Sequence, residues 1–272
     1  MKTLYVSDLD GTLLRSNQRT SDFTNRTINE LVDNGMLFSY ATARSYIAAM
    51  PVTEGLDARI PLIVYNGVMV VDNVDGSILF CHYLQEEAHQ LLDELMEQDI
   101  YPIVFSMIDG VEKMSYVPSK ISAETQRFVD MRDGDIRMHP VDDPQRLHDG
   151  DIFDITCIDK FDKLTPFYEK CKDHYQTIFQ LDIYTNDPWL EILPKGTSKA
   201  NAIKEVAQYY HCDKVIVFGD GINDIEMFKM ADEAYAVENA VPELKEIATG
   251  IIAGNNDDAV AKWLKEHYRA SV

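Results

Sequence analysis

The first fourteen residues, MKTLYVSDLDGTLL (1–14), decide the fold class of this chain. A short apolar run, TLYVS (3–7), leads directly into Asp8 and Asp10, and Gly11 follows them. An apolar run that ends in turn residues predicts a buried strand, and glycine allows a sharp turn after it. Side chains two residues apart in an extended chain point to the same side, so both carboxylates are expected to project from one strand end.

Alternating strands and helices follow this stretch and return near the end of the chain. We expect helices at 20–35, 43–50, 198–211, 223–231 and 257–268, strands at 36–42, 61–67, 214–220 and 233–237, and a hairpin over 68–80. Strands that are apolar throughout and alternate with helices predict a parallel sheet covered on both faces. The expected fold class is therefore α/β.

The middle of the chain has a different pattern. Helices are expected at 85–98, 120–132 and 161–175, a hairpin at 101–117, and strands at 153–159 and 177–185. Such a pattern predicts an antiparallel sheet with helices on one face, which is an α+β layer. We therefore expect a core made of residues 1–82 and 188–272, interrupted by an inserted α+β domain at 83–187.

The composition excludes several classes of protein. A chain of 272 residues with 46% hydrophobic residues can bury the cores of two domains. No apolar run approaches a membrane span and the first residues lack the apolar core of a signal peptide, so we expect a cytoplasmic protein without a membrane partner. A formal net charge of −21 argues against nucleic acid as a partner. The four cysteines are far apart and are expected as reduced thiols. The oligomeric state does not follow from the sequence.

Polar clusters follow the strands of the expected core. They are DLDGT (8–12), TAR (42–44), NG (66–67) and GDGIND (219–224), and PKGTSK (194–199) precedes a helix. In open parallel sheets, ligands bind outside the carboxyl ends of the strands, where the strand order reverses. The clusters are therefore expected to gather at one edge of the sheet.

These residue types suit phosphoryl chemistry. A carboxylate at a strand end, such as Asp8, can attack a phosphoryl group, and Asp10 is placed to give and take a proton. Asp220 and Asp224 offer the hard oxygen ligands that Mg²⁺ prefers. Lys199, at a helix start, would offset the repulsion between carboxylate and phosphate. The Thr42 hydroxyl and the N–H after it would hold a phosphoryl oxygen.

In this order and spacing, DLDGTLL, TAR, SK and GDGIND resemble the four motifs of the haloacid dehalogenase superfamily. The position of the insert resembles the Cof-type branch, subclass IIB, which carries an α+β cap of type C2. The resemblance implies a Rossmann-like core and Mg²⁺-dependent hydrolysis of a phosphomonoester through an aspartyl-phosphate.

The resemblance also implies roles for single residues. Asp8 would be the nucleophile and a metal ligand, and Asp10 the general acid/base, with its backbone carbonyl on the metal. Asp220 would bind the metal and Asp224 would support the metal's waters. The phosphate would be held by Leu9, Thr42, Ala43, Lys199 and Asn223. The family usually has glycine where this chain has Ala43, and we expect this change to affect only the shape of the loop.

Other interpretations remain for several of these residues. Asp8 and Asp10 are also common turn residues beside a glycine. Lys195 competes with Lys199, although Lys199 follows the helix start. Arg44 and Asn66 follow strands at the same edge as substrate-contact candidates, but a structural Arg–carboxylate pair and a plain turn explain them nearly as well.

The sequence as a whole predicts a Mg²⁺-dependent phosphatase whose partner is a small phosphorylated metabolite, with sugar phosphates as the leading class. A phosphomutase on the same scaffold is an alternative, because Asp10 serves both reactions. A non-catalytic phospho-aspartate switch is a third and weaker alternative, because Asp10 can catalyse breakdown of the acyl-phosphate that a switch must preserve.

Overall fold

The computed structural model describes residues 1–182 and 185–269. The chain forms two compact units, Met1–Cys81 with Ser198–Val272, and His82–Thr197. An inserted domain at nearly the expected place thus interrupts the first unit. Its second boundary lies at Thr197 and not at Asp187, because β11 (Pro188–Leu193) pairs with two strands of the inserted unit.

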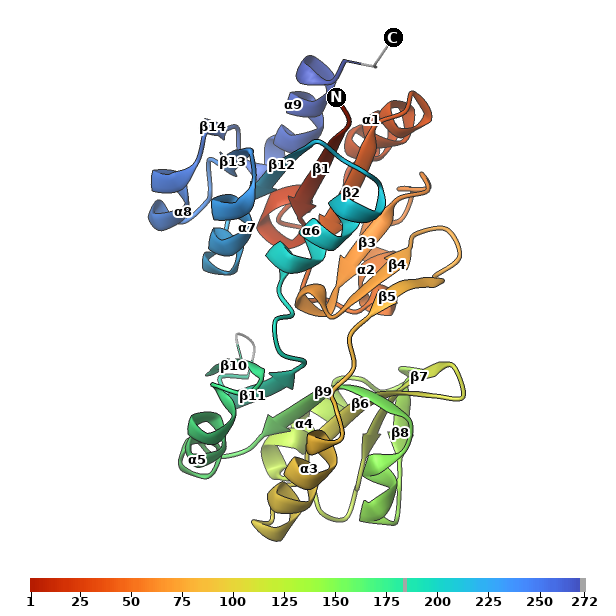
Figure 1. Cartoon of the computed structure of the whole chain (residues 1–272), viewed down its shortest axis with the longest axis vertical. Helices are drawn as coiled ribbons and strands as arrows, with labels where there is room; N and C mark the ends of the chain where they lie inside the picture. Colours follow the sequence, from red (N-terminus) through yellow and green to blue (C-terminus); the bar gives the residue numbers. More distant parts are fainter. Residues whose placement is uncertain (183–184, 270–272) are drawn as a thin grey trace. The chain divides into compact units, whose positions relative to one another are not determined.

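The first unit is built on a mixed sheet in the order β14-β13-β12-β1-β2-β3-β4-β5 (Figure 1). Its described strands are β1 (Thr3–Asp8), β2 (Leu37–Ala41), β3 (Pro61–Val64), β4 (Met69–Asp72), β5 (Ile78–Cys81), β12 (Lys214–Gly219), β13 (Glu233–Val237) and β14 (Gly250–Ile252). Pairing is parallel from β14 to β3, and β4 and β5 add an antiparallel hairpin at the edge. This arrangement confirms the α/β fold class.

Helices cover both faces of this sheet. They are α1 (Asp22–Asp33), α2 (Tyr46–Ala49), α6 (Lys199–Tyr209), α7 (Ile225–Met230), α8 (Pro242–Ile247) and α9 (Ala259–His267). The side chains of β1 point alternately to the two faces of the sheet. Leu4 and Val6 are buried in the core cluster that also contains residues of α6 and α7. Tyr5, between them, contacts the ring of Trp263 in α9. Figure 1 shows α1 and α9 side by side.

Strand register brings the polar clusters to one edge of the sheet. Ser7 lies opposite Phe218 on β12, and Asp8 lies opposite Ala41 on β2. The chain leaves β1 toward β2 and β3 and later returns on the other side of β1 as β12. The reversal of strand order therefore falls beside β1, which is where open α/β sheets bind ligands.

The inserted unit is a second sheet, in the order β10-β11-β9-β6-β7-β8. Its described strands are β6 (Ile103–Ile108), β7 (Val111–Tyr116), β8 (Met138–Pro140), β9 (Asp151–Ile158), β10 (Gln176–Leu181) and β11, and its helices are α3 (Glu87–Glu97), α4 (Ala123–Asp130) and α5 (Phe161–Cys171). The pairing is antiparallel as expected, except that the short β8 pairs parallel with β7.

The helices of the inserted unit do not all share one face. α3 and α5 pack with Leu190 in the apolar core, as expected. The preceding residue, Trp189, points to the opposite face of the strand and contacts Phe128 of α4. The expectation of helices on a single face is therefore wrong for α4, because this pair of rings holds it on the other face.

No helix within residues 1–182 and 185–269 is both long and apolar enough to cross a membrane. The four cysteines are free thiols.

Candidate active site

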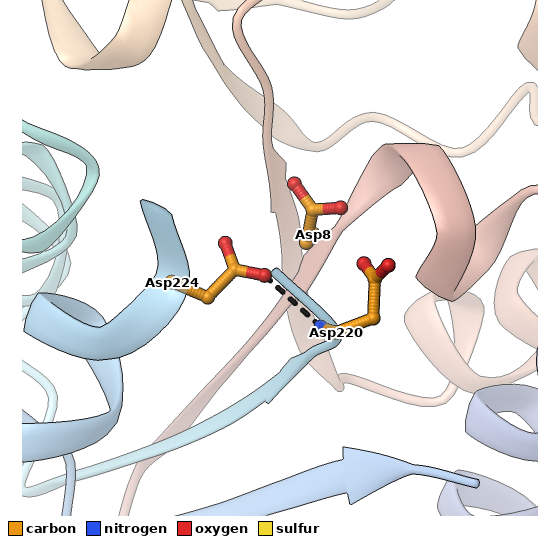
Figure 2. A group of neighbouring side chains, drawn as sticks. All are labelled: Asp8, Asp220 and Asp224. Atoms are coloured by element: carbon orange, nitrogen blue, oxygen red, sulfur yellow. Dashed lines mark hydrogen bonds between the residues drawn. The ribbon is translucent and has the colours of Figure 1, made fainter. Parts of the chain in front are cut away.

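Three carboxylates from two strand ends meet at the edge of the first sheet. Asp8 ends β1, Asp220 follows β12, and Asp224 ends the short turn η5 (Ile222–Asp224). One carboxylate oxygen from each of the three lies within 4.8 Å of the others. Figure 2 shows the three side chains around a common space. Residues more than two hundred positions apart in the chain are thus brought together, as the strand-end motifs predict.

Lys199 supplies the positive charge in this group. It is the first residue of α6, and Ser198 caps the helix by accepting a hydrogen bond from Asn201 N. Its ammonium group donates to Asp8 Oδ1 and, at 2.8 Å, to Asp224 Oδ1. Lys195, the competing candidate, is exposed, and its ammonium donates to the backbone oxygen of Asp173.

Burial and the neighbouring charges shift the pKa values of this group. Burial raises the pKa of Asp8 well above the ordinary aspartate value, against the opposing effect of the Lys199 ammonium group. Burial also raises the pKa of Asp220. Burial alone would lower the pKa of Lys199, but Asp8 and Asp224 outweigh it, so that pKa is raised and the lysine stays charged. Three carboxylates thus face a single ammonium group, which leaves an excess of negative charge when all three are ionised.

Asp224 uses both of its oxygens within the protein. Oδ1 accepts from Lys199, while Oδ2 accepts from the backbone N–H groups of Asp220 and Gly221, both at 3.0 Å. Figure 2 shows the bond from Asp220. The Asp224 side chain is completely buried. Asp224 therefore fixes the loop after β12 and orients Lys199.

The turn after β1 fits closely against Asp220. Gly11 has a φ of +77°, and a Cβ at this position would lie 2.3 Å from Asp220 Oδ2. Thr12 donates its hydroxyl to Asp220 Oδ1 at 2.7 Å. Asn239 donates to the backbone oxygen of Gly11 at 2.8 Å. Thr12 belongs to the DLDGT motif, which is the signal that could have indicated its role, whereas nothing in the sequence singles out Asn239.

The Asp10 carboxylate pairs with a different cation, Arg44. The two carboxylate oxygens accept from Arg44 Nε at 2.9 Å and Arg44 Nη2 at 2.6 Å. Half of the Asp10 side chain is exposed, as is about a quarter of the Arg44 side chain. The Arg–carboxylate pair that the sequence left as one option for Arg44 is therefore present.

The remaining candidates lie at the same sheet edge. Thr42 is buried, and its hydroxyl accepts from Arg44 N at 3.1 Å, while Ala43 beside it is exposed. Asn66 lies in the turn η3 (Tyr65–Gly67), and its N–H donates to Thr42 O at 3.0 Å. The Leu9 side chain is fully buried, and Leu9 begins the irregular turn η1 (Leu9–Leu13). Asn223 is exposed on η5.

Gly67 joins two of these segments. With a φ of +97°, it approaches the start of α6 so closely that a Cβ would lie 2.3 Å from Ser198 O. The turn that carries Asn66 is thereby held against the backbone that carries Lys199.

The donor set fits a small divalent cation. Carboxylate oxygens are the ligands that Mg²⁺ takes from proteins, and the acidic group carries more negative charge than Lys199 offsets. The Lys199 ammonium group, together with a cation held by these carboxylates, would neutralise an anionic group at the sheet edge.

Comparison with known proteins supports this description. Residues 5–264 match the family model of the haloacid dehalogenase-like hydrolases. Two curated Bacillus subtilis proteins, each named a 5-amino-6-(5-phospho-D-ribitylamino)uracil phosphatase, are similar along their whole length. YitU is 27% identical over 97% of both chains, and YwtE is 28% identical over 98% of both.

Among solved structures, TM0651 of Thermotoga maritima is 24% identical, with a TM-score of 0.77 over 100% of this chain and 99% of its own. That likeness concerns the fold alone. The family model covers nearly the whole chain and both motif-bearing ends, and the chain therefore belongs to the haloacid dehalogenase-like hydrolases.

Proposed function

We propose that the protein is a Mg²⁺-dependent phosphatase that hydrolyses small phosphomonoesters through a phosphorylated Asp8. The observation that carries this proposal is the buried Asp8 carboxylate, held by Lys199 within an acidic group at the end of the central strand. A carboxylate fixed in this way is a suitable nucleophile for phosphorus, because its partner cation also neutralises the incoming phosphate.

The first half-reaction transfers the phosphoryl group to the enzyme. An oxygen of Asp8 attacks phosphorus, the bond from phosphorus to the ester oxygen breaks, and Asp10 gives a proton to the departing alkoxide. In the second half-reaction, water attacks the phosphorus of the acyl-phosphate. Asp10 takes a proton from this water, the bond to Asp8 breaks, and inorganic phosphate leaves.

The other residues bind and orient the phosphate in this scheme. Lys199 and the backbone N–H groups of Leu9 and Ala43 would hold its oxygens, together with the Thr42 hydroxyl and the Asn223 amide. Asp224 keeps Lys199 in place through the 2.8 Å contact. Asn66 is placed by its backbone bond to Thr42 and would contact the substrate beyond the phosphate.

Asp8, Asp220 and the backbone carbonyl of Asp10 would hold Mg²⁺, with Asp224 supporting the waters of the ion. When bound, the ion would neutralise charge on the phosphoryl oxygens and on Asp8. The excess of carboxylates over ammonium groups in the site supports this assignment.

The names of the relatives support a substrate class. YitU and YwtE are named for a substrate that carries a phosphorylated ribityl chain, which is a sugar-alcohol phosphate. We therefore propose a small phosphorylated sugar or sugar alcohol as the substrate. Both relatives are named phosphatases, which favours hydrolysis over the mutase reaction that Asp10 would also permit.

Release of phosphate from p-nitrophenyl phosphate in the presence of Mg²⁺ tests the proposal. The wild type should turn over, and Asp8→Asn, which keeps the size of the side chain, should lose at least about 10³-fold in kcat, since an amide oxygen is a poor nucleophile. Equal turnover by the two proteins would refute the role of Asp8. A panel of sugar and sugar-alcohol phosphates then ranks substrates, and product analysis with a hexose 1-phosphate separates hydrolase from mutase.

A further inference from the structure

The fork between Arg44 and Asp10 is partly exposed to solvent and has a defined geometry. Nε and Nη2 of Arg44 each donate to a different oxygen of Asp10, at 2.9 and 2.6 Å. Two parallel bonds of this kind fix both the position and the plane of a carboxylate. A cation that made only one contact would fix the distance to the carboxylate but not the orientation of its plane.

The backbone of Arg44 is itself anchored on both sides. Its N–H donates to Thr42 Oγ1 at 3.1 Å, and its oxygen accepts from Tyr65 N at 3.0 Å. The next residue, Ser45, caps α2 by accepting from Ala48 N at 3.1 Å. The guanidinium group therefore extends toward Asp10 from a backbone segment that is tied to β2, to η3 and to a helix start.

Asp10 has less support of its own. It lies in the irregular turn η1, where its own backbone and that of Gly11 depart from helical angles. Half of its side chain is exposed. An exposed aspartate without a partner samples several rotamers, and each rotamer places the carboxyl group differently relative to Asp8.

We propose that Arg44 is a positioning residue that holds the Asp10 carboxyl group in the orientation needed for proton transfer. This inference rests on the proposed function, since it takes the proton-transfer role of Asp10 from it. It differs from the sequence-based expectation that Arg44 contacts the substrate, because two of its three guanidinium nitrogens are engaged by Asp10.

The inference has a kinetic signature. Proton donation by Asp10 matters most when the leaving group is a basic alkoxide, and it matters little for p-nitrophenolate, which leaves without a proton. A loss of Asp10 orientation should therefore lower kcat/KM for an alkyl phosphate more than for p-nitrophenyl phosphate. Loss of a phosphate-binding residue would lower both equally.

The experiment compares Arg44→Met, Arg44→Lys, Asp10→Asn and Asp10→Asn/Arg44→Met on both substrates with Mg²⁺. Glycerol 3-phosphate serves as the alkyl ester. Arg59→Met is the matched control, because Arg59 also bridges carboxylates of the first unit, at Asp72 and Asp75, away from the acidic group. Thermal melts check that each variant is folded.

Arg44→Met should lower kcat/KM for glycerol 3-phosphate about 10- to 100-fold, part of the 10²- to 10⁴-fold that proton transfer contributes, with less than about a threefold loss for p-nitrophenyl phosphate. Arg44→Lys should recover only part of the loss, since an ammonium group cannot form the fork. In the Asp10→Asn background, Arg44→Met should change kcat/KM less than about twofold, because a positioning residue acts only through its partner.

Equal losses on the two esters, or a full loss in the Asp10→Asn background, would overturn the inference and assign Arg44 to substrate binding. Activity of Asp8→Asn provides the separate check on the proposed function. If Asp8→Asn is inactive and Arg44→Met behaves like Arg59→Met, the inference alone fails. If Asp8→Asn is active, the proposed function fails, whatever Arg44 does.

Discussion

The ammonium group of Lys199 lies 2.8 Å from Asp224 Oδ1, and both side chains are almost completely shielded from solvent. The same ammonium group contacts Asp8. One buried cation therefore links the residue that ends the first strand to the loop after β12, across nearly the whole length of the chain. This cation therefore affects the stability of the fold as well as the chemistry of the site, because removing it leaves two buried carboxylates without their partner.

Lys199→Met is expected to lose both activity and stability. Breaking a buried ion pair by removing one partner costs about 3–5 kcal/mol, so the free energy of unfolding should fall by a similar amount at pH 7. Hydrolysis of p-nitrophenyl phosphate should fall together with it. Urea unfolding and steady-state assays measure the two effects.

Lys195→Met is the matched control for this variant. Lys195 is exposed and contacts only the backbone oxygen of Asp173 among the contacts described, so its loss should change the free energy of unfolding by less than about 0.5 kcal/mol. A larger effect of Lys195→Met than of Lys199→Met would reverse the assignment of the two lysines.

The sequence predicted which residues would meet at this site, but not how their side chains pair. Asp8, Asp220 and Asp224 converge because parallel strands bring their carboxyl ends to one edge, a relationship that strand order alone determines. The NG pair (66–67) indicates the turn at η3, but the fork from Arg44 to Asp10 also depends on side-chain rotamers, which no residue pattern specifies. The partner of Asp10 therefore could not be predicted from the sequence.

The boundary of the inserted unit was missed for a related reason. The segment between β10 and β11 contains Thr185, Asn186 and Asp187 before a proline, a composition that suits a linker and a hairpin turn equally well. Only the pairing of β11 with β9 and β10 decides between them. Long-range pairing of this kind is set by the packing of the whole sheet, which a local pattern does not report.

Divalent cations should stabilise the protein, apart from any effect on activity. Mg²⁺ would offset the negative charge that Lys199 leaves among the three carboxylates. A ligand that binds only the folded state adds about 2.7 kcal/mol at a concentration one hundred times its Kd, so millimolar Mg²⁺ should raise the thermal midpoint of the metal-free protein by several degrees. Differential scanning calorimetry with and without chelator measures this shift.

Asp220→Asn should abolish most of the Mg²⁺-dependent rise. The amide is nearly the same size and can still accept from Thr12, so the fold should survive. An unchanged Mg²⁺ effect in Asp220→Asn would remove this residue from the metal site.

Gly67→Ala should be more destabilising than an ordinary change at a left-handed glycine. The new methyl group would lie 2.3 Å from Ser198 O, so η3 and the start of α6 must separate. Gly134→Ala is the control, because its φ of +81° is comparable and no described atom lies within 4 Å of a Cβ there. Gly134→Ala should cost about 1–2 kcal/mol from backbone strain alone, and Gly67→Ala clearly more. Chemical denaturation measures both costs, and equal costs would show that the contact with Ser198 relaxes freely.

The inserted unit should lose stability as the pH rises, through Asp154. Burial raises the pKa of Asp154 well above its ordinary value, and the Glu191 carboxylate adds to the rise. A carboxyl group with a raised folded-state pKa binds its proton more tightly in the folded protein. Stability is therefore greatest below the unfolded-state pKa and falls as the pH rises from there toward the folded-state value.

Asp154→Asn removes this dependence and keeps an oxygen that accepts from Thr156 Oγ1, which lies 2.9 Å from the native carboxylate. Relative to the wild type, the variant should gain free energy of unfolding between pH 4 and pH 8, by more than about 1 kcal/mol, since each unit of pKa difference corresponds to about 1.4 kcal/mol. Asp142→Asn, at an exposed position of the same unit, is the control for the substitution itself. Urea unfolding at several pH values measures both. If the free energies of unfolding of Asp154→Asn and the wild type change equally with pH, the Asp154 carboxyl group carries the same charge in the folded and unfolded states. Burial would then not raise its pKa.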